Sequence, residues 1–321
     1  MQKYSLILAV AFTLVACTRS NQPGSQATYV DTLSRDYIVS TYSAGFLRYQ
    51  SPQGLCIDQN GIFYSSNSAG WILKIPSSNT YSALDTLGLD IPKVVYDPAG
   101  NIIALVASSN LILKITPAGA VTLLAGGARP PTDGQGSSAG FANLADLTID
   151  STGTIYVADG DLIRKINRSG LVTTIYKDSS GSNLISAITV DRAGNLYYAT
   201  GNQLWRLDPL GNKTLIAGSS TAKGDLDGPG MTATFTNVGA LQIDQQGNLI
   251  AGDLYAVRQV TPAGTVGTIA GSDTSALTTG VVNGPGNLAK FGSVSGLVVD
   301  SDGAIFVADE LADAIRKIVH K

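Results

Sequence analysis

The sequence repeats one short unit six times, and this repetition limits the possible folds more than any other feature. Each copy places two apolar runs of three to five residues on either side of a turn of the form Asp-x-x-Gly. Aspartate at the first position of such a turn caps the backbone, and glycine is favoured at the fourth position. The six turns begin at Asp58, Asp97, Asp150, Asp191, Asp244 and Asp300.

A third apolar run follows in each copy, as in "LIRKI" (162–166), and a turn then leads to a fourth, as in "NRSGLVTTI" (167–175). Runs this short, rich in Val, Ile, Leu and Tyr, are typical of buried strands. A single four-stranded sheet of this kind would leave both apolar faces in water, so the copies must stack on one another. We therefore predict an all-β chain that forms a six-bladed β-propeller of four-stranded antiparallel blades.

The two ends of the repeat region complement each other. The sixth copy stops at "AIRKIVHK", before any fourth strand, whereas "DYIVSTYSAG" (36–45) precedes the first copy and resembles the missing strand. We expect this N-terminal strand to pair into the last blade and close the ring. Residues 36–321 are then one propeller domain.

The first residues have the features of an export signal. Lys3 precedes the apolar run Tyr4–Ala16, which as a helix would span roughly 20 Å and fall short of the ~30 Å hydrocarbon core. The run ends in Leu14-Val15-Ala16-Cys17, which resembles the lipobox of bacterial lipoproteins. The resemblance implies that residues 1–17 are a lipoprotein signal peptide with its lipobox cysteine and that Cys17 is lipidated. An ordinary secretory signal is the alternative.

The lipoprotein resemblance also predicts a location. The protein would be exported and membrane-anchored, and Thr18 after the cysteine favours the outer membrane, with the protein facing the periplasm or the cell surface. Residues 18–35 are polar, with Pro and Gly, and we predict a flexible tether. Cys56 is the only other cysteine, and its apolar neighbours predict a small buried side chain.

The repeated unit resembles the NHL repeat over nearly all of residues 36–321. The shared pattern runs from "GL-x-x-D-x-x-G" through "YVAD" and "IRKI" to "TIAG", and it includes "DGQGSSAGF", "DGPGMTATF" and "NGPGNLAKF". The third and sixth copies match best, whereas the fourth has Trp205-Arg206-Leu207 in place of the basic pair. The resemblance implies a six-bladed propeller. WD40 propellers are the alternative, but the Trp-Asp signature is absent.

Antiparallel order assigns the connections to two faces. The Asp-x-x-Gly turns and the turns between strands three and four share one face, and all other connections share the opposite, loop-rich face. Three long crossings on the loop-rich face (126–143, 218–237 and 271–293) end near Phe141, Phe235 and Phe291, which we expect to be core anchors. Long loops in compact domains are usually functional or disordered. We predict that this face binds a ligand through residues drawn from Asp159, Asp161, Asn202, Asp253, Tyr255, Asp309, Glu310 and Asp313.

Residue types limit the chemistry. His320, next to the last residue, is the only histidine, so we expect neither a His-based zinc site nor a Ser-His-Asp triad. We assign no catalytic residue, no metal ligand and no cofactor. Lactonase-type propellers hold a divalent cation on Glu, Asp and Asn, and the Asp and Asn residues here keep Ca²⁺ open as an alternative.

The net charge of −3 gives no reason to expect a nucleic-acid partner. We expect solvation for the basic residues near the ends of the third strands, namely Lys74, Lys114, Lys165, Arg206, Arg258 and Lys317. The leading hypothesis is a non-catalytic binding or scaffold protein, lipid-anchored in the cell envelope, that recognises a protein, peptide or glycan. The alternative is a metal-dependent lactonase-like or hydrolase-like enzyme with a divalent cation in the central channel.

Overall fold

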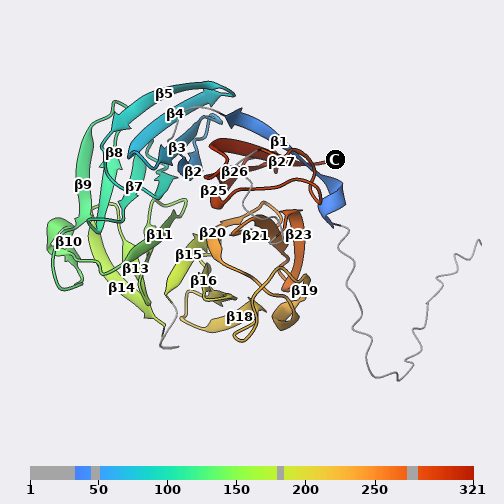
Figure 1. The fold of residues 1–321 in the computed structure, drawn as a ribbon. Coiled ribbons are helices and arrows are strands. Elements are labelled where there is room, and N and C mark those ends of the chain that lie inside the picture. The colour runs from blue at the N-terminus through green and yellow to red at the C-terminus, as the bar shows by residue number, and fades with distance from the viewer. Residues whose placement is uncertain (1–32, 45–50, 179–183, 273–280) are drawn as a thin grey trace, which may run out of the picture. The chain divides into compact units, whose positions relative to one another are not determined.

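Six small antiparallel sheets form a ring in the described part of the chain (Figure 1). The structure is a computed structural model that describes residues 33–44, 51–178, 184–272 and 281–321. Cys17, the predicted signal peptide and most of the predicted tether lie outside these residues. Across the described ranges, no helix is both long and apolar enough for a membrane crossing.

Each sheet is one blade, and its strands run in order from the central channel to the outer rim. Blade 1 contains β2 (Pro52–Ile57), β3 (Phe63–Asn67), β4 (Trp71–Ser77) and β5 (Thr80–Thr86). Blade 2 contains β6 (Lys93–Tyr96), β7 (Ile102–Val106), β8 (Leu111–Ile115) and β9 (Val121–Gly126). Blade 4 contains β15 (Ile185–Val190), β16 (Leu196–Thr200), β17 (Gln203–Leu207) and β18 (Lys213–Gly218).

The other three blades carry a short fifth strand at the rim. Blade 3 contains β11 (Leu144–Ile149), β12 (Ile155–Asp159), β13 (Leu162–Ile166), β14 (Leu171–Lys177) and β10 (Gly134–Gln135). Blade 5 contains β20 (Val238–Ile243), β21 (Leu249–Asp253), β22 (Ala256–Val260), β23 (Thr265–Gly271) and β19 (Gly228–Pro229). Blade 6 contains β25 (Val294–Val299), β26 (Ile305–Asp309), β27 (Ala314–His320), β1 (Tyr37–Ala44) and β24 (Gly284–Pro285). Three 3₁₀ turns complete the fold: η1 (Leu33–Asp36), η2 (Gly136–Ser138) and η3 (Gly230–Thr232).

The predicted ring closure is confirmed. β1 pairs antiparallel with β27, from Tyr37 opposite His320 to Ala44 opposite Ala314. On its other side, β1 pairs with β24. The N-terminal strand therefore occupies the fourth position of the last blade (Figure 1).

The six repeated turns form as their sequence predicts. In the first turn, Asp58 Oδ1 accepts hydrogen bonds from the backbone N–H groups of Asn60 at 2.8 Å and Ile62 at 2.9 Å. Gly61 has φ of +77°, a conformation that glycine adopts without strain. The other five turn aspartates accept the equivalent bond from the residue two positions later. We call the side of the ring that carries these turns the turn face, and the opposite side the loop face.

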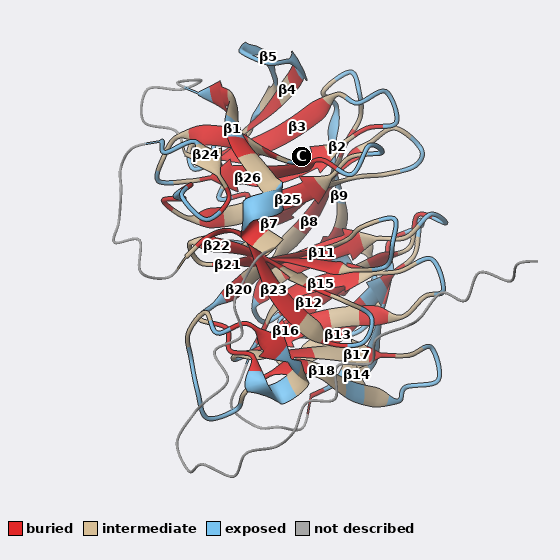
Figure 2. Cartoon of the chain, turned by 90° about the vertical axis from the view of Figure 1, so that its right-hand side faces the viewer, coloured by how far each residue is buried: buried red, intermediate tan, exposed pale blue. Residues whose placement is uncertain are grey.

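The core lies between blades. Each of the six apolar clusters in the described residues draws side chains from two neighbouring sheets, so every blade shelters the faces of its neighbours. Cys56 is buried, as predicted, and belongs to the cluster between blades 1 and 2; burial raises the pKa of its thiol. In a side view, the inner strands are largely buried and the connections are largely exposed (Figure 2).

Candidate functional site

Three buried arginines organise the loop face. Arg164, Arg258 and Arg316 occupy the same position in the third strands of blades 3, 5 and 6, and none is more than 1% exposed. Each lies beside one of the three long crossings. We call the described parts of these crossings (126–143, 218–237 and 281–293) the arms, and each arginine with its partners a clamp.

The clamp of blade 5 shows the arrangement. Arg258 bridges two aspartates, with Nη1 3.2 Å from Asp253 on β21 and Nη2 2.6 Å from Asp227 on the arm. Its guanidinium also lies over the ring of Phe235, 5.3 Å from the centroid. Thr268 on β23 donates to Asp227 through its backbone N–H at 2.9 Å and its hydroxyl at 3.0 Å. One arginine thus joins the second, third and fourth strands of its blade to the arm.

Blade 3 repeats the arrangement. Arg164 bonds Asp159 at 2.8 Å and Asp133 at 2.9 Å, and it lies 5.3 Å from the ring centroid of Phe141. Thr174 on the outer strand donates to Asp133. These bonds from Thr174 and Arg164 hold the pKa of Asp133 below its usual value, although partial burial acts in the opposite direction.

Blade 6 builds its clamp with an amide on the arm. Arg316 bonds Asp309 at 2.8 Å and Asn283 Oδ1 at 2.8 Å, with Phe291 beneath the guanidinium. The side-chain amide of Asn283 donates to Thr41 Oγ1 at 3.0 Å. Because Thr41 lies on β1, the N-terminal strand completes this clamp as well as the sheet.

Three of the predicted ligand-face residues belong to these clamps, which corrects their expected place on the exposed rim. Asp159, Asp253 and Asp309 are at most 1% exposed. Their second oxygens accept backbone N–H groups where the arms end, as Asp253 Oδ1 does from Thr236 and Asn237. Burial raises the pKa of Asp253 and of Asp309, although the arginines and these hydrogen bonds act against it. The three carboxylates stabilise the scaffold of the face.

The prediction for Arg258 is also wrong. It was expected to be a solvated strand-end residue equivalent to Lys165, but the strand register places Gln259 at that position. Arg258 is the equivalent of Arg164 and points into the clamp. Phe141, Phe235 and Phe291 are buried, so their prediction as core anchors is confirmed.

The other five candidates are partly exposed and lie in turns of four blades: Asp161, Asn202, Tyr255, Glu310 and Asp313. Asp161 lies 3.6 Å from the ammonium of Lys177, and Asp313 has φ of +48° and a pKa raised by burial. Only Glu310 and Asp313 are joined, by a backbone hydrogen bond of 3.2 Å. These residues are therefore spread around the loop face. Within the described ranges, no three His, Cys, Asp or Glu side chains are grouped as metal ligands.

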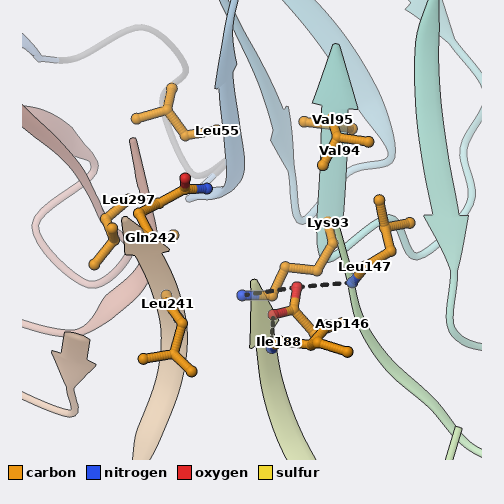
Figure 3. A pocket seen from close by; sticks show the side chains of 12 residues that line it. Leu55, Lys93, Val94, Val95, Asp146, Leu147, Ile188, Leu241, Gln242 and Leu297 are labelled. Carbon is orange, nitrogen blue, oxygen red and sulfur yellow. Dashed lines mark hydrogen bonds and ion pairs between the residues drawn. The ribbon is translucent and has the colours of Figure 1, made fainter. Parts of the chain in front are cut away.

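The central channel holds an ion pair between Lys93, which is partly buried, and Asp146, which is buried (Figure 3). Lys93 extends from β6, and its Nζ donates to the main-chain oxygens of Gly239 at 2.7 Å and Ser295 at 3.0 Å, in blades 5 and 6. The same nitrogen lies 3.9 Å from Asp146 in blade 3, and Asp146 accepts the N–H of Ile188 in blade 4. The cavity beside the pair measures about 30 Å³, space for roughly two water molecules. A ligand of several heavy atoms does not fit here.

Burial raises the pKa of Asp146 above its usual value, and the nearby ammonium of Lys93 opposes that shift. Neither residue was predicted as part of a site. The pair joins blades on opposite sides of the ring, because one ammonium contacts blades 3, 5 and 6 from a strand of blade 2.

Similar solved structures have this fold. An auxiliary nutrient-binding protein from Bacteroides thetaiotaomicron matches with a TM-score of 0.70 and 17% identity, over 89% of this chain and 77% of that chain. A protein of unknown function from the same organism matches with a TM-score of 0.69 and 19% identity, over 88% of this chain and 76% of that chain. Virginiamycin B lyase from Staphylococcus aureus matches with a TM-score of 0.60 and 14% identity, over 88% of this chain and 99% of that chain.

No protein-family model matches the chain, and no curated protein matches its sequence. At identities this low, the structural similarities show the propeller fold alone.

Proposed function

We propose that this chain is a non-catalytic binding protein of the bacterial cell envelope that recognises a protein, peptide or glycan on its loop face. The observation that carries the proposal is the set of three clamps. Each fixes a long arm to its blade through a buried arginine that contacts both β-strand and arm. A surface whose loops are already ordered loses less conformational entropy on binding, which favours recognition.

The similarity to an auxiliary nutrient-binding protein supports a binding role, since that protein shares the fold over most of this chain. The channel supports it as well. A divalent cation in the channel would meet the ammonium of Lys93, which already occupies two main-chain oxygens there. The partly exposed residues of the loop face, including Tyr255 and Glu310, are our candidates for ligand contact.

Binding arrays of envelope glycans and peptides test the proposal with the purified full chain. We expect Tyr255→Ala and Glu310→Ala to weaken the interaction at unchanged melting temperature. Arg192→Ala, on a turn of the opposite face, is the matched control and should leave binding intact. Loss of binding with the control alone would move the site to the turn face.

The alternative enzyme with a channel cation has a separate test. If it were correct, a chelator would lower the melting temperature and added Ca²⁺ would restore it. We expect neither treatment to change the melting temperature, because Lys93 supplies the positive charge at this position.

We further propose that Cys17 is lipidated and anchors the protein in the outer membrane. Tyr37 pairs with His320, so β1 enters blade 6 from the turn face. Mass spectrometry of the membrane fraction tests the modification, and Cys17→Ser should release the protein in soluble form.

A further inference from the structure

The arms fill a particular space at the rim of the ring. Each runs down the wedge between its own blade and the preceding one: β10 pairs with β14, and η2 packs against β9 of blade 2. At the end of this path, the N–H of Gly136 donates to the carbonyl oxygen of Gly170 at 2.9 Å. Gly230 makes the same bond to Gly264, also at 2.9 Å, beside β18. The arms thus occupy the junctions between blades 2 and 3, 4 and 5, and 5 and 6.

Among the described residues, no arm occupies this position at the junction between blades 3 and 4. The chain passes from Lys177 at the end of β14 to Ile185 at the start of β15 through a short crossing, 178–184. Side chains fill the part of the wedge that is nearer the loop face. Lys213 bonds Asp178 at 2.9 Å there, and its ammonium lies 3.9 Å from the ring centroid of Trp205. Nearer the turn face, the wedge opens into a groove of about 500 Å³, within the usual range for ligand pockets.

The groove corresponds to the site of an arm turn. Leu207–Gly211, on one wall, are the equivalents of Ile166–Gly170 in blade 3, where η2 lies. Ile175, on the other wall, is the equivalent of Leu124 in β9. Leu124 packs against the cluster that contains arm residues, whereas Ile175 is 42% exposed. The same position is therefore covered in one junction and open in the other.

The groove walls are apolar with a cationic edge. Leu196, Leu207, Ile175 and Leu210 line it, and the Leu210 side chain is 88% exposed. Lys165 adds an exposed positive charge. Gly211 is the equivalent of the glycines in blades 3 and 5 whose carbonyl oxygens accept the N–H of an arm glycine. Among the described residues, no group donates a hydrogen bond to the carbonyl oxygen of Gly211.

We propose that this blade 3–4 groove binds an extended, glycine-containing peptide segment of a partner protein, in the way that the chain's own arms bind at the junctions between blades 2 and 3 and between blades 4 and 5. The apolar walls contact its side chains, Lys165 faces an acidic residue of the peptide, and Gly211 accepts a backbone N–H. The groove lies beside turns of the turn face, opposite the candidate residues of the loop face. Its test is therefore independent of the loop-face proposal.

The experiment titrates the full chain with a synthetic peptide of arm sequence, residues 225–234 (DLDGPGMTAT), by calorimetry, with a scrambled peptide as reference. We expect the wild type to bind the arm peptide and Leu210→Asp to bind it at least about tenfold more weakly. Leu288→Asp is the matched control, because Leu288 is also well exposed, at 62%, but lies on the arm of blade 6. It should bind like the wild type, and so should Tyr255→Ala.

Several results would overturn the proposal. These are no binding of the arm peptide at millimolar concentration, equal binding of the scrambled peptide, or equal affinities for Leu210→Asp and Leu288→Asp. An oligosaccharide whose binding depends on Leu210, in the absence of peptide binding, would assign the groove to a glycan. Melting temperatures of both variants should match the wild type, because both leucines are largely in solvent.

Discussion

Blades 3, 5 and 6 differ from blades 1, 2 and 4 at matching positions. The first group has arginine in the third strand, aspartate at the end of the second and threonine in the outer strand. In the second group, the third strand has an apolar or aromatic residue at this position. The second strand ends in an uncharged residue, and the outer strand has a small or apolar residue. The arm-bearing set is Arg164, Asp159, Thr174; Arg258, Asp253, Thr268; and Arg316, Asp309, Thr41. The other set is Leu73, Asn67, Ala83; Leu113, Val106, Leu123; and Trp205, Thr200, Leu215.

The difference between the two groups of blades indicates the role of the buried Arg and Asp side chains in the clamps. A valine at one position of the outer strand is 0% exposed in blade 3 (Val172), 0% in blade 5 (Val266) and 1% in blade 6 (Val39), but 36% exposed in blade 2 (Val121). Only blade 2 among these lacks an arm. An arm brings main-chain polar groups into the wedge, and buried polar groups need partners. The clamp supplies them, so the buried charge occurs where an arm does.

The largest expected effect comes from removing β1, which supplies both a strand and Thr41 to blade 6. Deletion of residues 37–44 exposes the edge of β27 and the core around Val39. We expect a loss comparable to the whole stability of a typical domain, about 5–15 kcal/mol, and therefore no cooperative unfolding transition. Thermal unfolding followed by circular dichroism measures this.

A deletion of residues 19–30 is the control, because it lies upstream of η1 and β1. It should melt like the full chain. If the 37–44 deletion also melted like the full chain, β1 would not be what closes the ring.

The next effect ranks the clamps against each other. Arg258→Met leaves two buried carboxylates, because the side chains of Asp253 and Asp227 are 0% and 7% exposed. Arg164→Met leaves one buried carboxylate, since the side chain of Asp133 is 50% exposed and can be hydrated. We expect a loss of about 3–5 kcal/mol for Arg258→Met and a smaller loss for Arg164→Met. Urea unfolding of both variants measures the order, and equal losses would contradict the role assigned to the arm carboxylate.

Much of the architecture could be predicted from the sequence, because the repeated turn and the short apolar runs are local signals. The N-terminal strand could be placed because the sixth copy lacks its fourth run. The clamps were missed because Arg258 and Asp227 lie 31 residues apart, in segments that alignment on the turns does not compare. One sequence signal could have indicated the clamps. In blades 3 and 5, an Asp and an Arg recur five residues apart, and each pair follows an arm that contains the sequence Asp-Gly-x-Gly.

The candidate site was predicted less well, and the reason is physical. Aspartates at strand ends have the same sequence appearance whether they face solvent or a buried arginine, as Asp161 and Asp159 show. The channel pair and the blade 3–4 groove depend on which blades become neighbours when the ring closes. The distance between Lys93 and Asp146 follows from that closure and has no local sequence signal.

The ion pair in the channel joins Lys93 of blade 2 to Asp146 of blade 3, and therefore one group of blades to the other. Its contribution to stability can be tested through its pH dependence. Asp146→Asn replaces the carboxyl group near Lys93 by a neutral amide. At acidic pH, where Asp146 is protonated and also neutral, we expect it to cost no more than about 1 kcal/mol. Burial raises the pKa of Asp146 in the folded protein, so the folded state binds this proton more tightly than the unfolded chain. The wild type therefore loses stability as pH rises from near 3.9 through the folded pKa, and the variant does not.

The stability of the wild type relative to Asp146→Asn should thus fall as pH rises. Urea unfolding at several pH values between about 3.5 and 7 measures it. A wild type that gains stability relative to the variant as pH rises would mean that Lys93 outweighs burial in setting the ionisation of Asp146.

The smallest effects come from exchanging residues at one matched position of the outer strand. Thr268→Val removes a hydroxyl that donates to the buried Asp227, and we expect it to cost about 1–2 kcal/mol. Leu123→Thr places that hydroxyl in blade 2, where Leu123 is 44% exposed. No arm among the described residues enters the corresponding wedge, between blades 1 and 2, so we expect a change within about 0.5 kcal/mol. Chemical unfolding of the two variants compares them directly. Equal costs would show that the outer strand prefers one residue type regardless of the arm, and the division between the two groups of blades would then have a cause other than the arms.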